Sequence, residues 1–341
     1  MRALPVLNPP SRFLASELHY EDGEAPTQSL DVYEDQSRQI LSKNESPDVP
    51  FSFSVNPYRG CMHACAYCYA RPTHEYLSFG AGTDFDRKIL VKPHAAELLR
   101  EAFHKPTWRG EPVAMSGVTD CYQPLEAKYL LTRALIEVCV EYKNPFLIVT
   151  KSPLIERDID LLAAAAEQMD VRVAMSIPIL ERAVGKALEP GVPPAERRFR
   201  TIERLAAAKV PVGVLVAPII PGLTDDDAPR ILEAAREAGA RFAGRVMLRL
   251  PGSAKDVFLE RLRRELPAQA ERVLARIKEV RGGRMNDTTF GRRGQGEGPY
   301  AESVAALFDT TAKRLGSEEL PPPRATFERP LARGPQLALF R

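Results

Sequence analysis

Three cysteines in the first quarter of the chain, Cys61, Cys65 and Cys68, are the residues best suited to carry chemistry. Their C-x3-C-x2-C spacing places three thiolates on one loop, where each can bind a different iron of one iron–sulfur cube. A fourth cysteine ligand would make the cluster a plain electron carrier, but the two remaining cysteines, Cys121 and Cys139, are far along the chain. The spacing therefore predicts a [4Fe–4S] cluster with one iron free to bind a small molecule.

A structural zinc site is the alternative interpretation of the same residues. Zinc usually takes four nitrogen or sulfur ligands, commonly presented as two pairs. His63 could be the fourth ligand, but it is too close in sequence to Cys61 and Cys65 to complete the usual tetrahedron comfortably. No second Cys/His pair follows at the spacing of a zinc finger, so the ligand set favours the iron–sulfur cluster.

The composition is typical of a soluble globular protein. The 341 residues are 44% hydrophobic and 27% charged, and no apolar run is long enough to span a bilayer. Residues 1–13 lack the pattern of a signal peptide, and five cysteines are too few for a disulfide scaffold. We therefore expect a cytoplasmic protein with reduced thiols and no membrane contact.

Strand and helix patterns alternate through the central part of the chain. Apolar, β-branched segments predict strands at 51–56, 112–116, 146–150, 171–177, 211–218 and 245–250. Helical periodicity predicts helices between them at 93–104, 125–142, 157–169, 196–209 and 225–238. This alternation is typical of βαβ units with a parallel sheet. The sequence therefore predicts an α/β fold, a partial (βα)6 TIM-type barrel.

The segments around the barrel complete the predicted organisation. Residues 1–50 are polar and rich in proline, which predicts an N-terminal arm, and the barrel itself takes residues 51–252. Helical patterns at 255–265, 267–280 and 301–315 predict a helical C-terminal extension over 253–319, with a Gly/Arg-rich loop at 281–299. Residues 320–341 form a proline-rich tail, of which residues 320–335 are expected to be an extended linker.

The cysteine loop resembles that of the radical S-adenosylmethionine (SAM) superfamily. The hallmark of that superfamily is C-x3-C-x2-C with an aromatic residue before the last cysteine, here Tyr67. The resemblance implies that SAM binds the free iron, that reduction cleaves it, and that the resulting 5′-deoxyadenosyl radical abstracts a hydrogen from the substrate. It also implies that Tyr67 packs against the adenine and that an electron donor such as flavodoxin or ferredoxin is a partner.

Within that superfamily the sequence is similar to the spore photoproduct lyase-like group of DNA repair lyases, from about residue 46 to residue 316. The resemblance brings a fold and cofactors but no settled substrate. The matching motifs, besides the cysteine loop, are at 70–76, 119–126, 150–152, 188–190, 217–222 and 248–251.

Five polar residues are implied by this resemblance to bind SAM. Thr119 and Asp120 follow the second predicted strand, where the superfamily binds the SAM amino group, and an aspartate there would accept a charge-assisted hydrogen bond from an ammonium. Lys151 and Ser176 follow the third and fourth strands, where the resembled lyases contact the SAM carboxylate. Arg198 completes the set. Each is also a common residue at a strand end, but their convergence at one barrel mouth favours a site.

The hydrogen donor of the lyase group does not transfer directly to this chain. Spore photoproduct lyase returns a hydrogen atom to its product radical from a cysteine that precedes the equivalent of Asp120, whereas Cys121 follows it here. Cys121, Tyr122 and Tyr69 are therefore the candidate donors. Cys139 lies in an apolar helical pattern and is expected in the core.

Two features suggest DNA as the partner. Residues 228–294 carry 16 lysines and arginines against 8 acidic residues, and the loop at 281–299 could either cradle a phosphate backbone or close the barrel bottom. The chain also ends with Gln336, Leu337, Ala338, Leu339 and Phe340, which resembles the bacterial sliding-clamp binding peptide. A tether would present the glutamine and two apolar anchors to a clamp pocket, although a terminal segment docked on its own barrel remains the alternative.

The sequence thus favours a radical SAM enzyme acting on damaged DNA. The second hypothesis is a radical SAM enzyme that modifies RNA, a protein or a small metabolite. A third is a protein without catalysis whose cluster senses redox state or iron.

Overall fold

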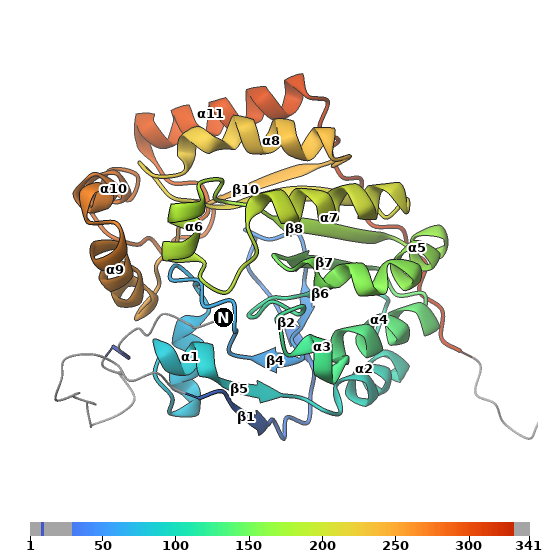
Figure 1. Ribbon diagram of the computed structural model, residues 1–341. Coiled ribbons are helices and arrows are strands. Elements are labelled where there is room, and N and C mark those ends of the chain that lie inside the picture. Colours follow the sequence, from blue (N-terminus) through green and yellow to red (C-terminus); the bar gives the residue numbers. More distant parts are fainter. Residues whose placement is uncertain (1–7, 10–28, 331–341) are drawn as a thin grey trace, which may run out of the picture.

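The computed structural model describes residues 8–9 and 29–330, and its centre is a curved, mostly parallel sheet with helices on its outer side (Figure 1). The sheet has seven strands in the order β10-β9-β8-β7-β6-β3-β2, and neighbouring strands are parallel except β2, which is antiparallel to β3. The strands are β2 Leu41–Lys43, β3 Phe53–Val55, β6 Val113–Met115, β7 Phe146–Thr150, β8 Val171–Ser176, β9 Val212–Ile219 and β10 Ala243–Met247.

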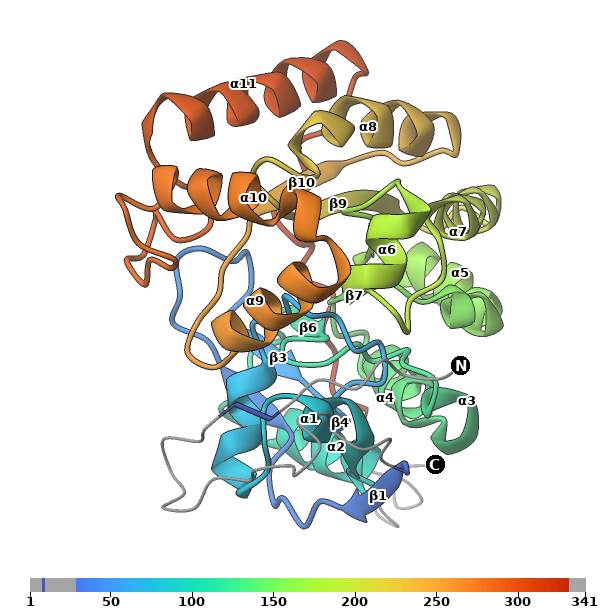
Figure 2. The same cartoon turned by 60° about the vertical axis from the view of Figure 1, so that its left-hand side comes forward.

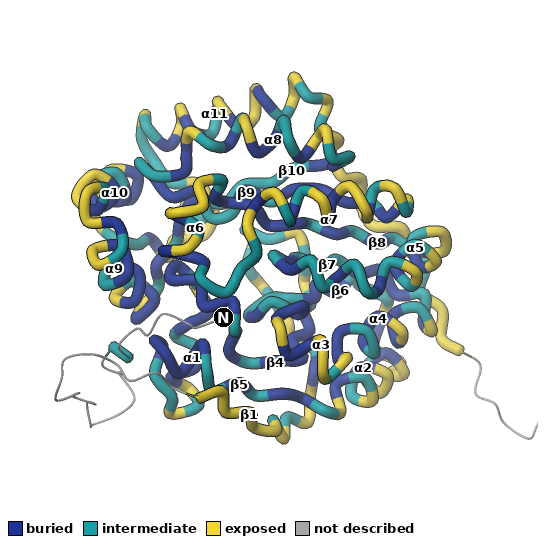
Figure 3. The backbone as a smooth tube through the Cα atoms, in the orientation of Figure 1, coloured by how far each residue is buried: buried dark blue, intermediate teal, exposed yellow. Residues whose placement is uncertain are grey.

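The six parallel strands confirm the predicted partial TIM-type barrel. Along β7 and β8, fully buried apolar residues alternate with half-buried ones, and Val113, Ile148, Val173 and Val212 are fully buried. The smooth tube in Figure 3 shows β7, β8 and β9 in the colours of buried and intermediate residues and the outer helices alternating between buried and exposed residues. The carboxyl ends of the parallel strands therefore meet at one mouth, where side chains from different strands can converge.

Amphipathic helices connect the strands and cover the outside of the sheet (Figure 1). Each helix buries apolar residues at helical spacing against the strands, as α7 (Ala195–Ala207) does with Ile202 and Leu205. The helices are α2 Ala95–His104, α4 Leu131–Glu141, α5 Ile159–Gln168, α7 Ala195–Ala207 and α8 Ala228–Glu237.

The single helix predicted at 125–142 is wrong in one respect. It is broken into α3 Glu126–Tyr129 and α4, because Leu130 has a left-handed backbone with φ of 55°. The break lets the buried Glu126 carboxylate accept hydrogen bonds from the Thr132 N–H (3.0 Å) and the Tyr58 hydroxyl (2.5 Å). The Glu126 side chain thus caps the N-terminus of α4 by accepting a hydrogen bond from its backbone.

A second, smaller sheet was not predicted. It has the order β1-β5-β4, with β1 Asp31–Glu34 parallel to β5 Lys88–Val91 and β4 Tyr58–Arg59 antiparallel to it. The described part of the predicted N-terminal arm therefore contributes two strands, β1 and β2, to the fold. Strands of two to four residues are too short to show periodicity, which is why the sequence did not predict them. The short elements η1 Arg71–Leu77 and α1 Thr83–Arg87 lie beside this sheet.

Three helices follow the last strand. They are α9 Ala254–Glu265, α10 Pro267–Glu279 and α11 Gly298–Arg314, close to the predicted extension. Figure 2 shows α10 beside α9, and α11 lies along α8. The short helix α6 Arg182–Leu188 contacts α9. Among the described residues, no helix has both the length and the apolar character needed to cross a membrane.

Residues 317–329, which we call the strap, do not form the free linker expected from their prolines. The strap runs along the end of the barrel opposite the mouth. Phe327 packs against Phe103 and Tyr142 at ring-centroid distances of 6.2 Å each. Other contacts are Arg172 to the Pro321 carbonyl (2.5 Å), Arg324 to the Met169 carbonyl (2.8 Å), Thr326 to the Lys143 carbonyl (2.8 Å) and Arg329 to the Trp108 carbonyl (2.6 Å).

Candidate radical SAM site

The cysteine loop begins directly after β4 and is held from several sides at the mouth. Gly60 has φ of 78°, and a Cβ there would lie 2.9 Å from the Phe85 carbonyl, so the turn requires glycine. The Cys61 N–H donates to the Phe85 carbonyl (2.9 Å), and the Ala66 N–H donates to the Leu188 carbonyl (2.8 Å). The loop is therefore fixed both by α1 and by the end of α6.

The three cysteines are free thiols gathered on this loop. Cys61 and Cys65 are each 7% exposed, and Cys68 is half-buried. Burial raises the pKa of the Cys68 thiol to about 11, and the Arg71 guanidinium opposes that rise. Within residues 8–9 and 29–330, no three His, Cys, Asp or Glu side chains converge on one point as the ligands of a single ion do. A cube binds each thiolate through a different iron, so three soft sulfur ligands spread over one loop fit it.

Arg71 supports the cysteine loop from beneath. Its side chain is fully buried, and its guanidinium donates to the Cys65 carbonyl (3.0 Å), the Ala81 carbonyl (2.8 Å) and Asp86 (2.9 Å). These bonds fix the position of Cys65. They also hold a positive charge beside Cys68, which would stabilise a bound thiolate.

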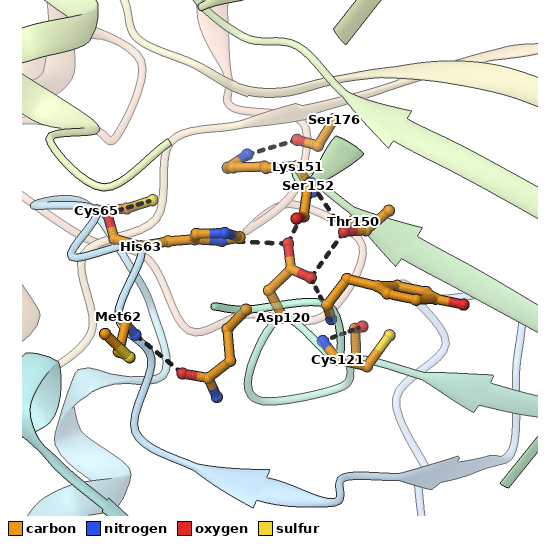
Figure 4. Close-up of polar contacts among 12 residues, drawn as sticks. Met62, His63, Cys65, Asp120, Cys121, Thr150, Lys151, Ser152 and Ser176 are labelled. Atoms are coloured by element: carbon orange, nitrogen blue, oxygen red, sulfur yellow. Dashed lines mark hydrogen bonds and ion pairs between the residues drawn. The ribbon is translucent and has the colours of Figure 1, made fainter. Parts of the chain in front are cut away.

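Asp120 connects the cysteine loop to the barrel and does not offer a free acceptor. Its carboxylate accepts hydrogen bonds from the Thr150 hydroxyl (2.7 Å), the Lys151 N–H (2.7 Å) and the Tyr122 N–H (2.9 Å), and His63 Nδ1 lies 3.3 Å away (Figure 4). Burial alone would raise its pKa, but His63 and these hydrogen bonds lower it. Four partners occupy the four lone-pair positions of a carboxylate. Asp120 therefore orients His63. The resemblance implied that Asp120 binds the SAM ammonium, but its carboxylate has no free lone pair in this arrangement.

Lys151, Ser176 and Arg198 do converge, as expected, and they converge around Glu189. Lys151 Nζ donates to Ser176 Oγ (2.5 Å) and lies 3.5 Å from the Glu189 carboxylate (Figure 4 shows the first contact). Arg198 donates to the other Glu189 oxygen (3.0 Å) and to the Ser176 carbonyl (2.8 Å). The Tyr67 hydroxyl also donates to Glu189. The sequence does not predict Glu189 as a site residue, although Glu189 lies in the matching motif at 188–190.

The charges of this group leave a surplus cation near the cysteine loop. Burial would raise the pKa of Glu189, but the charges of Arg198 and Lys151 hold it below its usual range. Two cations thus face one carboxylate, and the buried Nε of Arg198 has no hydrogen-bond partner within the part of the chain that the structure describes. Glu189 and Arg198 also line a cavity of 210 Å³ formed with α6. A second carboxylate, such as that of SAM, would satisfy this group of residues.

The remaining candidates occupy different surroundings. Thr119 is buried and donates to the Tyr58 carbonyl (3.3 Å). Cys121 and Tyr122 are fully buried in the main core, and the Tyr122 hydroxyl donates to Asp158 (3.0 Å), so neither reaches the mouth. Of the three expected hydrogen donors, Tyr69 is the one at the surface: it is 50% exposed and donates to the Gly117 carbonyl (2.5 Å).

The fold and the site define a radical SAM protein built on a partial TIM-type barrel. The sequence model of the radical SAM superfamily matches residues 55–235, more than half of the chain, and the protein belongs to this superfamily. Membership implies a [4Fe–4S] cluster and SAM as cofactors.

Relatives and solved structures are consistent with this assignment. An uncharacterized protein of Mycobacterium tuberculosis is 40% identical over 226 residues, 66% of this chain and 66% of that protein. An uncharacterized protein of Methanocaldococcus jannaschii is 30% identical over 173 residues, 51% of this chain and 62% of that one. The chain thus matches slightly less than two thirds of these relatives. Spore photoproduct lyase complexed with dinucleoside spore photoproduct has the same fold, with a TM-score of 0.58 and 16% identity over 84% of this chain and 79% of that one.

Proposed function

We propose that this protein is a radical SAM enzyme that acts on damaged DNA, in the manner of a spore photoproduct lyase-like lyase. The observation that carries the proposal is the adjacency of two groups at the barrel mouth. Three free cysteines lie on one loop, and the cationic group of Lys151 and Arg198 lies beside it, linked to that loop through Tyr67 and Glu189.

Each part of this site has a task in the proposed reaction. Cys61, Cys65 and Cys68 would hold the cluster, which with SAM supplies a 5′-deoxyadenosyl radical after one-electron reduction by a donor such as flavodoxin or ferredoxin. Lys151 and Arg198 would bind the SAM carboxylate, since their charges are only half compensated by Glu189.

Other residues would orient the cofactors and finish the reaction. Asp120 and His63 fix the loop relative to β7, so the cofactors would meet the substrate in a constant orientation. Tyr69 is at the surface next to Cys68 and is the candidate in position to return a hydrogen atom to a product radical. The burial of Cys121 argues against the cysteine chemistry of spore photoproduct lyase in this chain.

A DNA substrate is supported by the fold and by charge. The fold is shared with a lyase solved with a dinucleoside photoproduct, and residues 228–294 carry 16 lysines and arginines against 8 acidic residues. Radical SAM modification of RNA, a protein or a small metabolite is the alternative.

Anaerobic reconstitution with iron and sulfide, followed by reduction with SAM present, tests the proposal. With an ultraviolet-irradiated oligonucleotide deuterated in its thymines, we expect deuterium in 5′-deoxyadenosine and loss of the lesion. Equal SAM cleavage with and without damaged DNA, and no altered product, would reject the DNA assignment. Deuterium transfer from a labelled RNA or peptide instead would support the alternative.

A matched pair of cysteine variants tests the cluster itself. Cys65→Ala removes a thiolate of the loop, so we expect iron per chain after reconstitution to fall sharply, along with SAM cleavage. Cys139→Ala removes a thiol that is buried in the core on α4, and it should retain the iron content of the unaltered protein. Iron content unchanged in Cys65→Ala would contradict the assignment.

A further inference from the structure

An arginine without any hydrogen-bond acceptor lies at the mouth. Arg249 follows β10 by two residues, and its guanidinium carbon is 5.8 Å from the ring centroid of Tyr69, the residue after Cys68. Its Nε is buried with no hydrogen-bond partner, and across the described residues no nitrogen of its side chain donates a hydrogen bond or pairs with a carboxylate. A guanidinium whose Nε is buried without an acceptor costs free energy, and an anion bound to it would remove that cost.

The Gly/Arg-rich loop lies beside this arginine, at the mouth and not at the opposite end of the barrel. The Met247 N–H donates to the Gly294 carbonyl (2.9 Å), the Leu250 N–H donates to Asn286 (3.1 Å), and Arg281 donates to the Leu248 carbonyl (2.5 Å). These contacts fix the loop against the carboxyl end of β10. Of the two interpretations of the loop that the sequence left open, a surface closing the barrel bottom is therefore wrong.

The surroundings of Arg249 are cationic. Burial lowers its pKa, and the charge of Arg293 lowers it further, while Tyr69 and Asp48 act in the opposite direction. Arg281 is close enough for Arg249 to help lower its pKa to about 10, mainly through burial. The hydrogen bonds of Arg293 go to Asp48 and Ser46. Three guanidiniums thus share the region. Arg281 and Arg293 donate hydrogen bonds within the described part of the protein, whereas Arg249 donates none there.

Two exposed aromatic rings flank these cations. Tyr69 is 50% exposed and Phe290 is 56% exposed, and the Arg293 guanidinium lies 4.4 Å from the Phe290 ring centroid. Exposed rings beside cations are typical of surfaces that bind single-stranded nucleic acid, where bases stack on the rings and the cations hold the backbone. A small inorganic anion would give no reason for the rings to be exposed.

We propose that Arg249 binds a phosphodiester of a DNA strand at the barrel mouth, with neighbouring bases stacked on Tyr69 and Phe290. The guanidinium fork matches two phosphate oxygens, and Arg293 adds to the positive potential. Tyr69, whose ring lies 5.8 Å from the Arg249 guanidinium, is the residue after Cys68, so a phosphate bound to Arg249 would place the adjoining nucleotide near the cysteine loop. This inference rests on the proposed function, because it names the residue that would bind the DNA substrate of that function.

The test measures binding of the reconstituted protein to a fluorescent single-stranded DNA oligonucleotide between about 50 and 200 mM salt. For Arg249→Gln we expect roughly tenfold weaker binding, equal for different sequences, and a salt slope smaller by about one. Phe290→Ala should weaken binding several-fold with no change in the slope, since a ring carries no charge. Arg200→Gln, on the exposed outer side of α7, is the matched control and should bind like the unaltered protein.

Three outcomes would overturn the inference. These are equal DNA binding by Arg249→Gln and the unaltered protein, loss of SAM binding in that variant with DNA binding intact, and full competition by millimolar inorganic phosphate. Circular dichroism and iron content confirm that each variant is folded and loaded. If the unaltered protein bound no DNA, the proposed function would fail as well; if it bound DNA and the Arg249→Gln variant matched it, only this inference would fail.

Discussion

At the scale of single residues, the polar side chains around the cysteine loop are divided between support and binding. Arg71, Asp120 and His63 use their hydrogen-bonding groups within the protein, and they hold the loop in place. Arg198 and Arg249 instead have buried Nε atoms with no partner among the described residues, a feature that they share with Arg281. Buried donors are nearly always satisfied in folded proteins, and Arg198 and Arg249 lie beside Tyr67 and Tyr69 of the cysteine loop, so we expect ligand atoms at these two arginines.

The burial of His74 determines its protonation state. It follows the cysteine loop and is fully buried between Phe79 and Phe85, where Nε2–H donates to the Lys88 carbonyl (2.8 Å). Burial lowers its pKa from 6.5 to about 4. A histidine held neutral in the core cannot exchange protons with a substrate at neutral pH.

This burial predicts a pH dependence of stability. Between pH 6.5 and pH 4 the unfolded chain protonates His74 while the folded chain does not, so this contribution to stability is lost as the pH falls. We expect the free energy of unfolding in urea to decrease by about 2 kcal/mol from this residue between pH 7 and pH 5.

The control for this prediction is a pair of variants. His74→Phe keeps an aromatic ring in the cluster and should remove that part of the pH dependence. His104→Phe, exposed at the end of α2, should keep it. The same pH slope in His74→Phe and the unaltered protein would contradict the assigned burial effect.

At the scale of elements, the strap shows that a proline-rich segment need not be a linker. Prolines restrict the unfolded chain, so docking such a segment costs less conformational entropy than docking a flexible one. Arg172 of the barrel then donates to a backbone carbonyl of the strap, and Arg329 of the strap donates to a backbone carbonyl of the barrel.

Phe327 is expected to be the residue that anchors the strap. It packs over Gly110 and against Phe103 and Tyr142, and a Cβ on Gly110 would lie 2.2 Å from Phe327 Cβ. Phe327→Ala should lower the free energy of unfolding by about 2 kcal/mol, because a half-buried ring loses its contacts. Urea denaturation measures the difference. Leu320→Ala, exposed in the same strap, should change it by less than about 0.5 kcal/mol; equal losses in both would argue against an anchor.

At the scale of the whole molecule, the strap separates the barrel from the last residues of the chain. The clamp-binding-like residues Gln336, Leu337, Leu339 and Phe340 lie outside the described residues and stay a prediction. The strap ends beside the carboxyl end of α2, at the face opposite the mouth. A partner bound just beyond it would leave the mouth accessible to DNA.

Truncation tests this arrangement. Removal of residues 331–341 should abolish capture of the chain by an immobilised bacterial sliding clamp, because the glutamine and the apolar anchors are lost. It should leave stability unchanged, since the strap and Phe327 remain. Removal of residues 317–341 should abolish capture and also lower stability. Undiminished capture by the shorter truncation would refute the clamp prediction.

The sequence alone determined the parts of this protein that depend on local pattern. The six parallel strands follow from β-branched runs, and the cysteine loop and its superfamily follow from residue spacing, as in the match to residues 55–235. The proximity of Lys151 and Ser176 was predictable because the carboxyl ends of parallel strands meet at one mouth, whereas Arg198, on α7, was expected there only from the family resemblance.

Only the tertiary structure decided where unpaired groups and short strands lie. Whether Asp120 has a free oxygen, whether Cys121 faces the mouth, and whether Arg249 has an acceptor all depend on side chains distant in sequence. The small sheet and the strap depend equally on distant contacts, because two- to four-residue strands and proline segments carry no period of their own. Burial and hydrogen-bond partnership belong to the folded chain, and a sequence pattern records neither directly.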